Sequence, residues 1–334
     1  MVLIMEVQQE KEMQCGDGQA ATRHAQPLIT VAICTRNRVA LLRAAMVSVM
    51  GQLRSDTEML LVDNASTDET PAVAAAFAHA HSAVTVVREA ELGLSVARNT
   101  ALRVARGEYV IFLDDDAIAE AGWLDAYADL FHHPPTIDVI GAGGAVFPRY
   151  EVTPPAWLDP MANTMDWSRE TCVFKKRGGP WGCNFALHRA RTLALGGFNP
   201  ALGRKGKGMG AHEESDLFEK LQRGGGVFWW VPQARIRHHV ATERLTFWFH
   251  SRSEFSGGRT AAYYKLGQQP KGLVRFGWRI VRFGVAPLQI IAYTLLAAVA
   301  VLFRPLHVAA GTWFRACRNA GFMLGLVENG GAGR

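Results

Sequence analysis

A buried strand in this chain would end in three consecutive carboxylates. The apolar run 109–113 is followed directly by Asp114, Asp115 and Asp116. Clustered carboxylates at the mouth of a buried strand are destabilising unless their charge has a partner, and a divalent cation that prefers oxygen ligands is the simplest one. Aspartates also favour solvated turns and helix caps. The triplet alone leaves both interpretations open.

Strand and helix patterns alternate along the first half of the chain. Short apolar runs predict strands, and 3.6-periodic or Ala-rich stretches between them predict helices. The predicted strands are 28–34, 58–62, 83–87 and 108–113, and the predicted helices are 39–52, 71–81, 94–106 and 122–131. This alternation predicts an α/β fold with a parallel sheet and helices on both faces.

Polar residues follow three of the predicted strands. They are Thr35-Arg36-Asn37, Asp63-Asn64 and the aspartate triplet. Ligands of parallel α/β sheets bind at the carboxyl ends of the strands, at a topological switch point. We therefore expect the three polar segments to face one crevice.

Further along, the pattern is weaker. Residues 145–180 are rich in Pro and Gly, which predicts loops and short strands. Residues 185–191 should lead into a helix that ends at Gly196-Gly197, residues 213–222 should form a helix, and 227–231 should form an aromatic-rich strand. Three glycines after residue 223 give a stop signal for the second of these helices.

Charge is unevenly distributed along the chain. The formal net charge is +6, and residues 265–334 hold nine Lys or Arg and one acid, a net charge of +8, which leaves −2 for residues 1–264. A folded body without a basic excess argues against a nucleic-acid-binding surface. A basic terminal segment suits contact with anionic lipid, so a membrane surface is an expected partner.

One stretch of the basic segment is long and apolar enough for a bilayer. Residues 283–303 contain no Asp, Glu, Lys or Arg, and an arginine flanks each end. This length matches a membrane crossing, and a long buried helix is the alternative. Residues 306–327 gather apolar side chains near one helical face, which is typical of an interfacial amphipathic helix. Whether 283–303 spans the membrane or lies on it stays open.

Cysteine usage and the N-terminus indicate a cytoplasmic setting. The five cysteines are odd in number and lack CxxC spacing, so neither a disulfide framework nor a zinc site is indicated. Residues 1–26 lack the cationic start and long apolar stretch of a signal peptide. They are expected to form a poorly ordered extension.

Seven motifs occur in an order that resembles one family. They are TVAICTRNR at 30–38, LVDNASTD at 61–68, GLSVARN at 93–99, the aspartate triplet, GGF at 196–198, HEESDL at 212–217 and RHHV at 237–240. Together they resemble the family 2 inverting glycosyltransferases of bacterial polysaccharide and glycan biosynthesis. The resemblance implies a GT-A fold, Rossmann-like with a mostly parallel central sheet, at 27–264. The apolar and basic patterns described above add C-terminal membrane-associated helices at 265–334.

The resemblance implies that the first strand ends bind a nucleotide-sugar donor. The aspartate that contacts the base maps to Asp63, with Asn64 beside it and with Thr35 and Arg36 lining the same pocket. A turn in which Asp63 only caps a helix is the alternative. Arg98 would either face the nucleotide or pair with an acid on the surface.

The aspartate triplet resembles the DxD motif of these enzymes. By analogy Asp114 would lie near the ribose, Asp115 would belong to the donor site, and Asp116 would hold Mg²⁺ or Mn²⁺ against the diphosphate. Such an ion offsets the charge that develops on a nucleoside diphosphate leaving group. His238 would complete the metal site as a neutral imidazole. His239 is the competing candidate, and a pair of surface histidines is the alternative.

An acidic pair is the candidate for the catalytic base. Inverting transfer needs a group that takes the proton from the acceptor hydroxyl, and a carboxylate at a helix N-terminus is well held for this. The family usually has Glu-Asp here with the second residue as base, which maps to Glu214. Because this chain has Glu for Asp, Glu213 stays open as the base and Asp216 is a weaker candidate. Acidic enrichment of a first helical turn is the alternative.

Two further segments complete the expected site. The segment 181–184 resembles the family's floor of the donor-sugar and acceptor site, where the indole of Trp181 suits a sugar face; a core tryptophan is the alternative. The segment RKGKGMG at 204–210 is not a P-loop, because its spacing to Ser or Thr is wrong and no strand precedes it. It is expected to be a mobile cationic loop that closes over the diphosphate or a lipid-phosphate acceptor.

The expected function is inverting, metal-dependent transfer of a sugar from a nucleotide-sugar donor to a hydroxyl of a glycan or lipid-linked acceptor, at the cytoplasmic face of the cell membrane. A polyprenyl-phosphate sugar synthase is the alternative within the class. A non-catalytic membrane scaffold with the same fold is the alternative outside it, and the intact acidic motifs argue against it. A dinucleotide-dependent oxidoreductase is excluded, since the first strand is followed by TRNR and not by GxGxxG.

Overall fold

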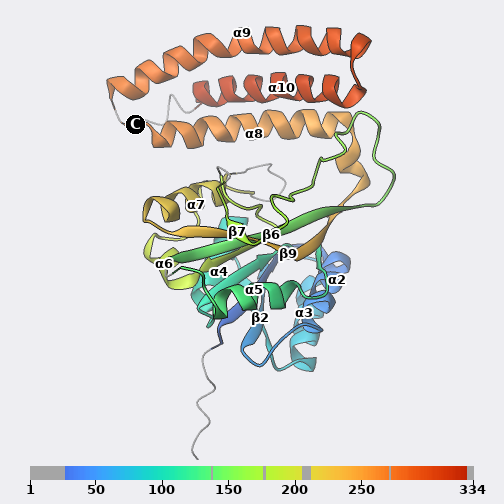
Figure 1. The fold of residues 1–334 in the computed structure, drawn as a ribbon, viewed down its shortest axis with the longest axis vertical. Helices are drawn as coiled ribbons and strands as arrows, with labels where there is room; N and C mark the ends of the chain where they lie inside the picture. Colours follow the sequence, from blue (N-terminus) through green and yellow to red (C-terminus); the bar gives the residue numbers. More distant parts are fainter. Residues whose placement is uncertain (1–26, 137, 176–177, 205–211, 271, 329–334) are drawn as a thin grey trace, which may run out of the picture.

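The computed structural model describes residues 27–136, 138–175, 178–204, 212–270 and 272–328. This part of the chain forms an α/β body and a layer of long helices that lies across one side of it (Figure 1). The predicted N-terminal extension at 1–26 and residues 205–210 of the predicted cationic loop lie outside the described residues.

One mixed sheet forms the centre of the body. Its strands are β1 (Ile29–Thr35), β2 (Thr57–Asn64), β3 (Val84–Glu89), β4 (Tyr109–Leu113), β5 (Ala117–Ala119), β6 (Val139–Tyr150), β7 (Cys172–Val173), β8 (Asn184–His188) and β9 (Val227–Val240). Their order is β3-β2-β1-β4-β8-β6-β9-β5, with β7 paired to β9. The first four strands pair in parallel, as predicted. Beyond β4 most pairs are antiparallel, so the α/β fold class is confirmed and the sheet is mixed.

Helices cover the sheet where the sequence predicts them. They are α2 (Val39–Met50), α3 (Thr70–Ala80), α4 (Leu94–Val104), α5 (Trp123–His132), α6 (Arg189–Ala194) and α7 (Glu213–Arg223). The buried positions of α2 are Leu42, Ala45, Met46 and Val49, the spacing of one helical face. Strands β2 and β4 are buried along their whole length, as expected for strands covered on both faces.

The prediction of loops and short strands from residue 145 onward was wrong for the first residues of that region. They belong to β6, whose glycines conceal its strand character, because glycine weakens a strand and lowers its propensity. Here the glycines are needed for close backbone approach. A Cβ on Gly141 would lie 2.2 Å from the Ala186 carbonyl oxygen, and a Cβ on Gly144 would lie 2.0 Å from that of Ala234.

Two other boundaries differ from the prediction for identifiable reasons. Strand β9 unites the predicted strand 227–231 with the run before His238, because the register shift between Gly144 and Val146 accommodates Pro232 and its neighbours. Strand β8 precedes the short helix α6, where a lead into a helix was expected, because it pairs with both β4 and β6.

The helical layer consists of α8 (Phe247–Gln268), α9 (Leu273–Phe303) and α10 (Leu306–Glu328), after the short 3-10 helix η1 (Thr242–Leu245). Helix α8 runs through the expected domain boundary at 264/265, so the layer begins at Phe247. Helix α9 contains the apolar segment 283–303 and is the one helix among the described residues that is long and apolar enough to cross a membrane. Helix α10 lies between α8 and α9 (Figure 1).

Candidate active site

The three polar segments that follow β1, β2 and β4 meet at one edge of the sheet. Thr35 and Asp63 are register partners at the ends of β1 and β2. The Thr35 hydroxyl donates to Asp115 Oδ2 at 2.7 Å, which joins the aspartate triplet to the same edge. The topology therefore brings together residues that lie up to 80 positions apart in the chain.

The two polar residues at the end of β2, Asp63 and Asn64, differ in how many of their polar atoms are already hydrogen-bonded. Asp63 Oδ1 accepts from the backbone N–H of Ser66 at 3.2 Å, and its buried Oδ2 has no hydrogen-bond partner among the described residues. The Asn64 amide donates to the carbonyls of Glu89 and Glu91 and accepts from the N–H of Gly93. Asn64 is thus committed to the loop that begins α4, whereas Asp63 keeps one acceptor atom available.

Two arginines near this edge differ in their partners. Arg36 is half-buried, and its Nε has no hydrogen-bond partner among the described residues. Arg38, which the sequence analysis did not single out as a site residue, places Nη1 3.0 Å from Asp115 Oδ1 and 2.7 Å from Asp116 Oδ2. Burial raises the pKa of Asp115 to about 6, although Arg38 opposes this shift. Both Asp115 oxygens are therefore engaged, by Thr35 and Arg38, within the protein.

Asp114, Asp116 and His238 form a cluster whose ligand atoms all lie within 4.8 Å of one another. The pairing of β5 with β9 sets His238 opposite Ala117 and brings Nε2 to 3.0 Å from Asp116 Oδ1. Two carboxylates and an imidazole suit Mg²⁺ or Mn²⁺. His239 instead contacts Glu151 Oε1 at 2.8 Å, so it does not join the cluster.

Asp116 is surrounded by cationic groups. Burial would raise its pKa, but the hydrogen bond and charge of His238, together with Arg38 and Arg244, hold the pKa well below its usual range. Burial alone would lower the pKa of His238. The hydrogen bond and the charge of Asp116 outweigh burial, so the pKa of His238 is raised. Arg244, from η1, lies 3.8 Å from Asp116 Oδ2 and has no sequence signal that marks it. Positively charged side chains therefore offset the charge of Asp116. A bound cation would offset the same charge.

Arg98 occupies the interior and links the acidic groups. Its side chain is 2% exposed, and the rings of Phe112, Phe185 and Phe198 surround the guanidinium. Nη1 lies 2.7 Å from Glu214 Oε1, while Nη2 lies 2.7 Å from the carbonyl oxygen of Gly182 and 3.5 Å from Asp114 Oδ1. Arg98 therefore pairs with acids, as one alternative held, but these acids line the site and are not on the surface.

Glu213 and Glu214 begin α7 and differ in protonation. Burial, and then the charge of Glu214, raises the pKa of Glu213 to about 8. Burial also opposes ionisation of Glu214, but the charge and hydrogen bond of Arg98 outweigh it and lower the pKa. The surroundings therefore favour the protonated form of Glu213 and the ionised form of Glu214. Asp216 pairs with Lys220 at 2.6 Å, as an ordinary surface pair one turn apart.

The segment 181–184 lies close to Glu214. A Cβ on Gly182 would lie 1.9 Å from Glu214 Oε1, so a larger residue at this position would have to displace the carboxylate. Trp181 is partly buried against the core. Asn184 accepts from the indole of Trp123 and from the Tyr127 hydroxyl, and it fixes the segment to α5.

The sequence matches known glycosyltransferases. Residues 30–191 match the family model described as Glycosyl transferase family 2. A glucosyl-dolichyl phosphate glucuronosyltransferase of Haloferax volcanii is 26% identical over 236 residues, which cover 69% of this chain and 75% of that protein. The succinoglycan biosynthesis protein ExoM of Rhizobium meliloti is 28% identical over 239 residues, 70% of this chain and 71% of that protein.

A solved structure has a related fold. A mannosyltransferase from Pyrobaculum calidifontis, solved with GDP-Man and Mn²⁺, is similar with a TM-score of 0.58 and 20% identity, over 96% of this chain and 94% of that one. This likeness confirms the GT-A fold. Residues 30–191 thus match the family 2 glycosyltransferases, the α/β body carries an aspartate-rich candidate metal site, and the protein is a glycosyltransferase.

Proposed function

We propose that this enzyme transfers a sugar from a nucleotide-sugar donor, with inversion, to a hydroxyl of a lipid-linked saccharide or a growing glycan. One observation carries the proposal: Arg98 contacts both Asp114, of the candidate metal cluster, and Glu214, the candidate base. A cation site and a base thus lie within the span of one guanidinium. Displacement at an anomeric carbon needs these two functions side by side, one for the leaving group and one for the nucleophile.

Residues at the ends of β1 and β2 would bind the nucleotide. Asp63 Oδ2 is a buried acceptor without a partner among the described residues, which suits an N–H of a base. Thr35 and Arg36 lie beside it on β1 and the loop that follows. Asn64 would act through the loop before α4, because its amide is already bonded there.

Asp114, Asp116 and His238 would hold Mg²⁺ or Mn²⁺. The fit rests on the O, O and N donor set, whose atoms lie within 4.8 Å of one another, and on the burial of Asp116. When bound, the ion would offset the charge that develops on the diphosphate leaving group. Arg38 and Arg244 lie at the carboxylate of Asp116 and are placed to bind phosphate oxygens.

Glu214 would act as the general base. It is ionised, it is held by Arg98, and its position at the N-terminus of α7 leaves it partly exposed. Glu214 accepts the proton of the acceptor hydroxyl while that oxygen bonds to the anomeric carbon. The bond from that carbon to the diphosphate oxygen breaks at the same time, and the diphosphate leaves with the electron pair. A single displacement of this kind inverts the anomeric centre.

The protonated Glu213 would support Glu214 by donating a hydrogen bond to it. Because Glu213 is protonated, no second negative charge lies beside the base. Two adjacent carboxylates that were both ionised would repel each other. This division of roles addresses which member of the Glu-Glu pair is the base.

A lipid-linked acceptor is supported by two observations. The Haloferax relative is named for a glucosyl-dolichyl phosphate acceptor. The helical layer, with its exposed apolar helix α9, would hold the enzyme at a membrane, and we assign it to the cytoplasmic face. A polyprenyl-phosphate sugar synthase would use a phosphate acceptor, which needs no strong base. Replacement of Glu214 by Gln distinguishes the two, since it should be mild only in the synthase.

The test is a donor panel with the purified full chain. Hydrolysis and transfer of nucleotide sugars are measured with Mn²⁺, with Mg²⁺ and with a chelator, for the natural enzyme and for Asp116→Ala. We expect turnover of at least one donor that the chelator and Asp116→Ala both abolish. Absence of binding and turnover of every nucleotide sugar in the presence of either ion would overturn the proposal.

A further inference from the structure

Helix α9 turns its apolar side outward and its polar side inward. Among its exposed residues only Thr294 has a polar side chain, and that hydroxyl donates to the carbonyl of Ile290. Leu288 is 68% exposed and Leu302 is 74% exposed. The polar and charged side chains Arg275, Arg279, Arg282, Gln289 and Tyr293 are half-buried, and those of Arg279 and Arg282 contact α10. Water favours the opposite arrangement, so this face has an apolar environment in its working state.

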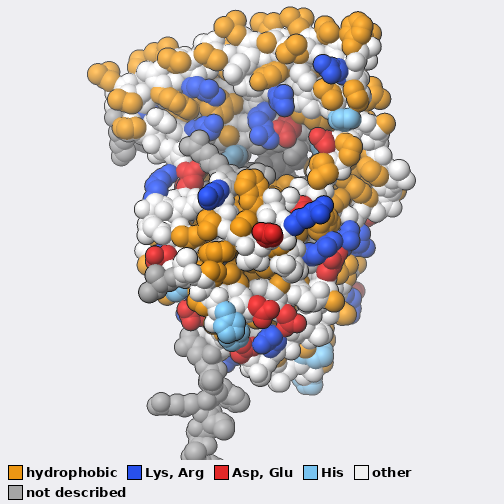
Figure 2. All heavy atoms as spheres, in the orientation of Figure 1, with side chains coloured by type: hydrophobic (Ala, Val, Ile, Leu, Met, Phe, Trp, Pro, Cys, Tyr) orange, Lys and Arg blue, Asp and Glu red, His pale blue; other side chains and the backbone are white. Residues whose placement is uncertain are grey.

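Figure 2 shows the same property as a strip of mainly hydrophobic side chains. Side chains of the hydrophobic type fill the outer edge of the molecule, over α9, while charged side chains gather nearer the body. The strip runs the full length of a helix of 31 residues, about 46 Å at 1.5 Å per residue. This length exceeds the hydrocarbon thickness of a bilayer, about 30 Å.

Helix α9 lies alongside α10. The rings of Trp278 and Phe322 are 6.2 Å apart, the Arg282 guanidinium lies 5.1 Å from the Phe322 ring, and Arg279 Nη2 is 3.5 Å from the carbonyl oxygen of Val327. These contacts pair the start of α9 with the end of α10, and residues 304–305 join their other ends. The two helices therefore form an antiparallel hairpin, which would have to cross a membrane as a unit (Figure 1).

The middle of α10 is unsuited to a membrane interior. Arg315 and Arg318 are both exposed there, and Arg318 pairs with Glu254 of α8. The backbones of α8 and α10 touch, since a Cβ on Gly321 would lie 1.8 Å from the Phe255 carbonyl oxygen. If the hairpin crossed, it would carry two arginines to the bilayer centre or break this contact with α8.

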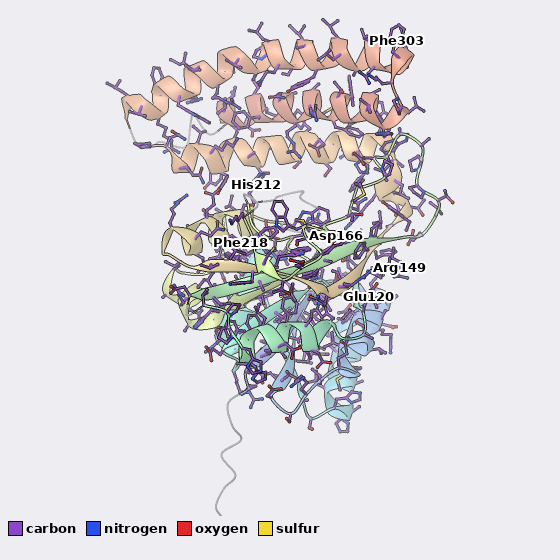
Figure 3. The ribbon with its side chains drawn as sticks, in the orientation of Figure 1. Glu120, Arg149, Asp166, His212, Phe218 and Phe303 are labelled. Atoms are coloured by element: carbon purple, nitrogen blue, oxygen red, sulfur yellow. The ribbon has the colours of Figure 1, made fainter. Side chains whose placement is uncertain are left out.

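Helix α8 is in turn attached to the catalytic body. Gln268 Nε2 donates to Glu219 Oε2 at 2.6 Å, and the Tyr264 ring stacks on His212 with centroids 5.6 Å apart. Figure 3 shows His212 on the side of the body that faces α8, with Phe303 at the far end of the outermost helix. The layer thus lies across the body, with α9 outermost.

We propose that α9 lies in the plane of the membrane, with its apolar face immersed in one leaflet, and does not cross. The partner of this apolar face is an anionic lipid surface. Arg275, Arg279 and Arg282 lie on the same helix as the apolar face, and residues 265–334 carry a net charge of +8, which favours anionic lipid. This inference goes beyond the proposed sugar transfer and is independent of it. Only the choice of the cytoplasmic leaflet rests on the proposed function.

The first test locates the two ends of α9. Gly272→Cys and Arg304→Cys are made singly in the full chain with its natural cysteines replaced by serine. A membrane-impermeant maleimide is then applied to spheroplasts and to inverted membrane vesicles. We expect both ends to be labelled from the same side, because the helix lies on one leaflet. Labelling of one end from each side would overturn the proposal.

The second test needs no cysteine-free chain. The purified full chain is mixed with preformed phosphatidylcholine vesicles that contain about 30% phosphatidylglycerol, and vesicle-bound protein is separated by flotation. The chain should float, and Leu288→Glu/Leu295→Glu should reduce the bound fraction about ten-fold or more. Val47→Glu, at an equally exposed position of α2, should have no effect. A chain that forms dimers through this face and does not float would contradict the proposal.

Discussion

Arg98, which is buried, forms an ion pair with the partly exposed Glu214, with Nη1 of the guanidinium 2.7 Å from Oε1 of the carboxylate. Asp114 and Glu213 lie 3.5 Å and 3.4 Å from the same guanidinium. We expect Arg98→Met to lower the free energy of unfolding by about 3–5 kcal/mol, because it leaves buried carboxylates without a counter-charge. Urea denaturation measures this change.

Arg54→Met is the matched control for this loss of charge. Arg54 pairs with Asp125 and Asp56 at the surface, and its side chain is 38% exposed. Exposed pairs contribute little, so the free energy of unfolding should change by less than about 1 kcal/mol. If the Arg98→Met variant were as stable as the natural enzyme, the ion pairs of Arg98 would not be what stabilises the nearby carboxylates.

Replacement of each glutamate of the pair by glutamine should separate their roles. Glu214→Gln removes the proposed base, and kcat should fall by about 10²–10⁴-fold with donor binding retained. Glu213→Gln replaces a protonated carboxyl by a neutral amide of similar shape, so kcat should stay within about ten-fold. Steady-state kinetics with saturating donor measures both. A larger loss in Glu213→Gln would assign the base to Glu213.

The pKa of Glu213 also predicts how stability depends on pH. In the folded protein burial raises this pKa from 4.5 to about 8, so the folded state keeps a proton that the unfolded state releases. Stability should therefore fall as pH rises from about 4.5 to about 8, by at most about 1.4 kcal/mol per pH unit, and level off above. Urea denaturation across this pH range measures the effect. The Glu213→Gln variant should lose less stability with rising pH than the natural enzyme, and an equal pH dependence in both would refute the prediction.

Local sequence predicts the site residues better than their partners. The aspartates and His238 stand in short motifs at strand ends, and parallel pairing of β1, β2 and β4 is enough to bring the strand ends together. Arg38 belongs to one of those motifs, yet its contact with Asp115 and Asp116 spans 77 and 78 positions. Arg244 belongs to no motif, because its position depends on the path of η1 after β9.

The fold shows the same limit. The early strands and helices have clear periodicity and lie close to their predicted bounds. Strand β6 does not, because Gly141 and Gly144 fit the close approach of neighbouring strands and not the intrinsic preference of an isolated strand. The interior position of Arg98 is hidden for a related reason: a charged residue at a helical position predicts exposure unless its distant acidic partners are known.

The adjacent histidines provide a matched test of the metal cluster. His238 contacts Asp116, whereas His239 contacts Glu151. We expect His238→Gln to weaken activation by Mn²⁺ about ten-fold or more, because it removes one of three ligand groups. His239→Gln should leave the metal dependence unchanged. Titration of activity against Mn²⁺ concentration measures both, and equal effects would remove His238 from the proposed site.

Gly182 lies so close to the candidate base, Glu214, that a side chain at this position would displace the carboxylate. Its Cβ, if present, would lie 1.9 Å from Glu214 Oε1, and its carbonyl accepts from Arg98. We expect Gly182→Ala to shift the carboxylate and to lower kcat by about 10²-fold, since a misplacement near 1 Å has an effect of this size. Gly51→Ala is the control, because Gly51 has ordinary helical φ and nothing within 4 Å of its Cβ position. If Gly182→Ala retained full kcat while Gly51→Ala behaved like the natural enzyme, the carboxylate of Glu214 would not need its present position, and its assignment as the base would fail.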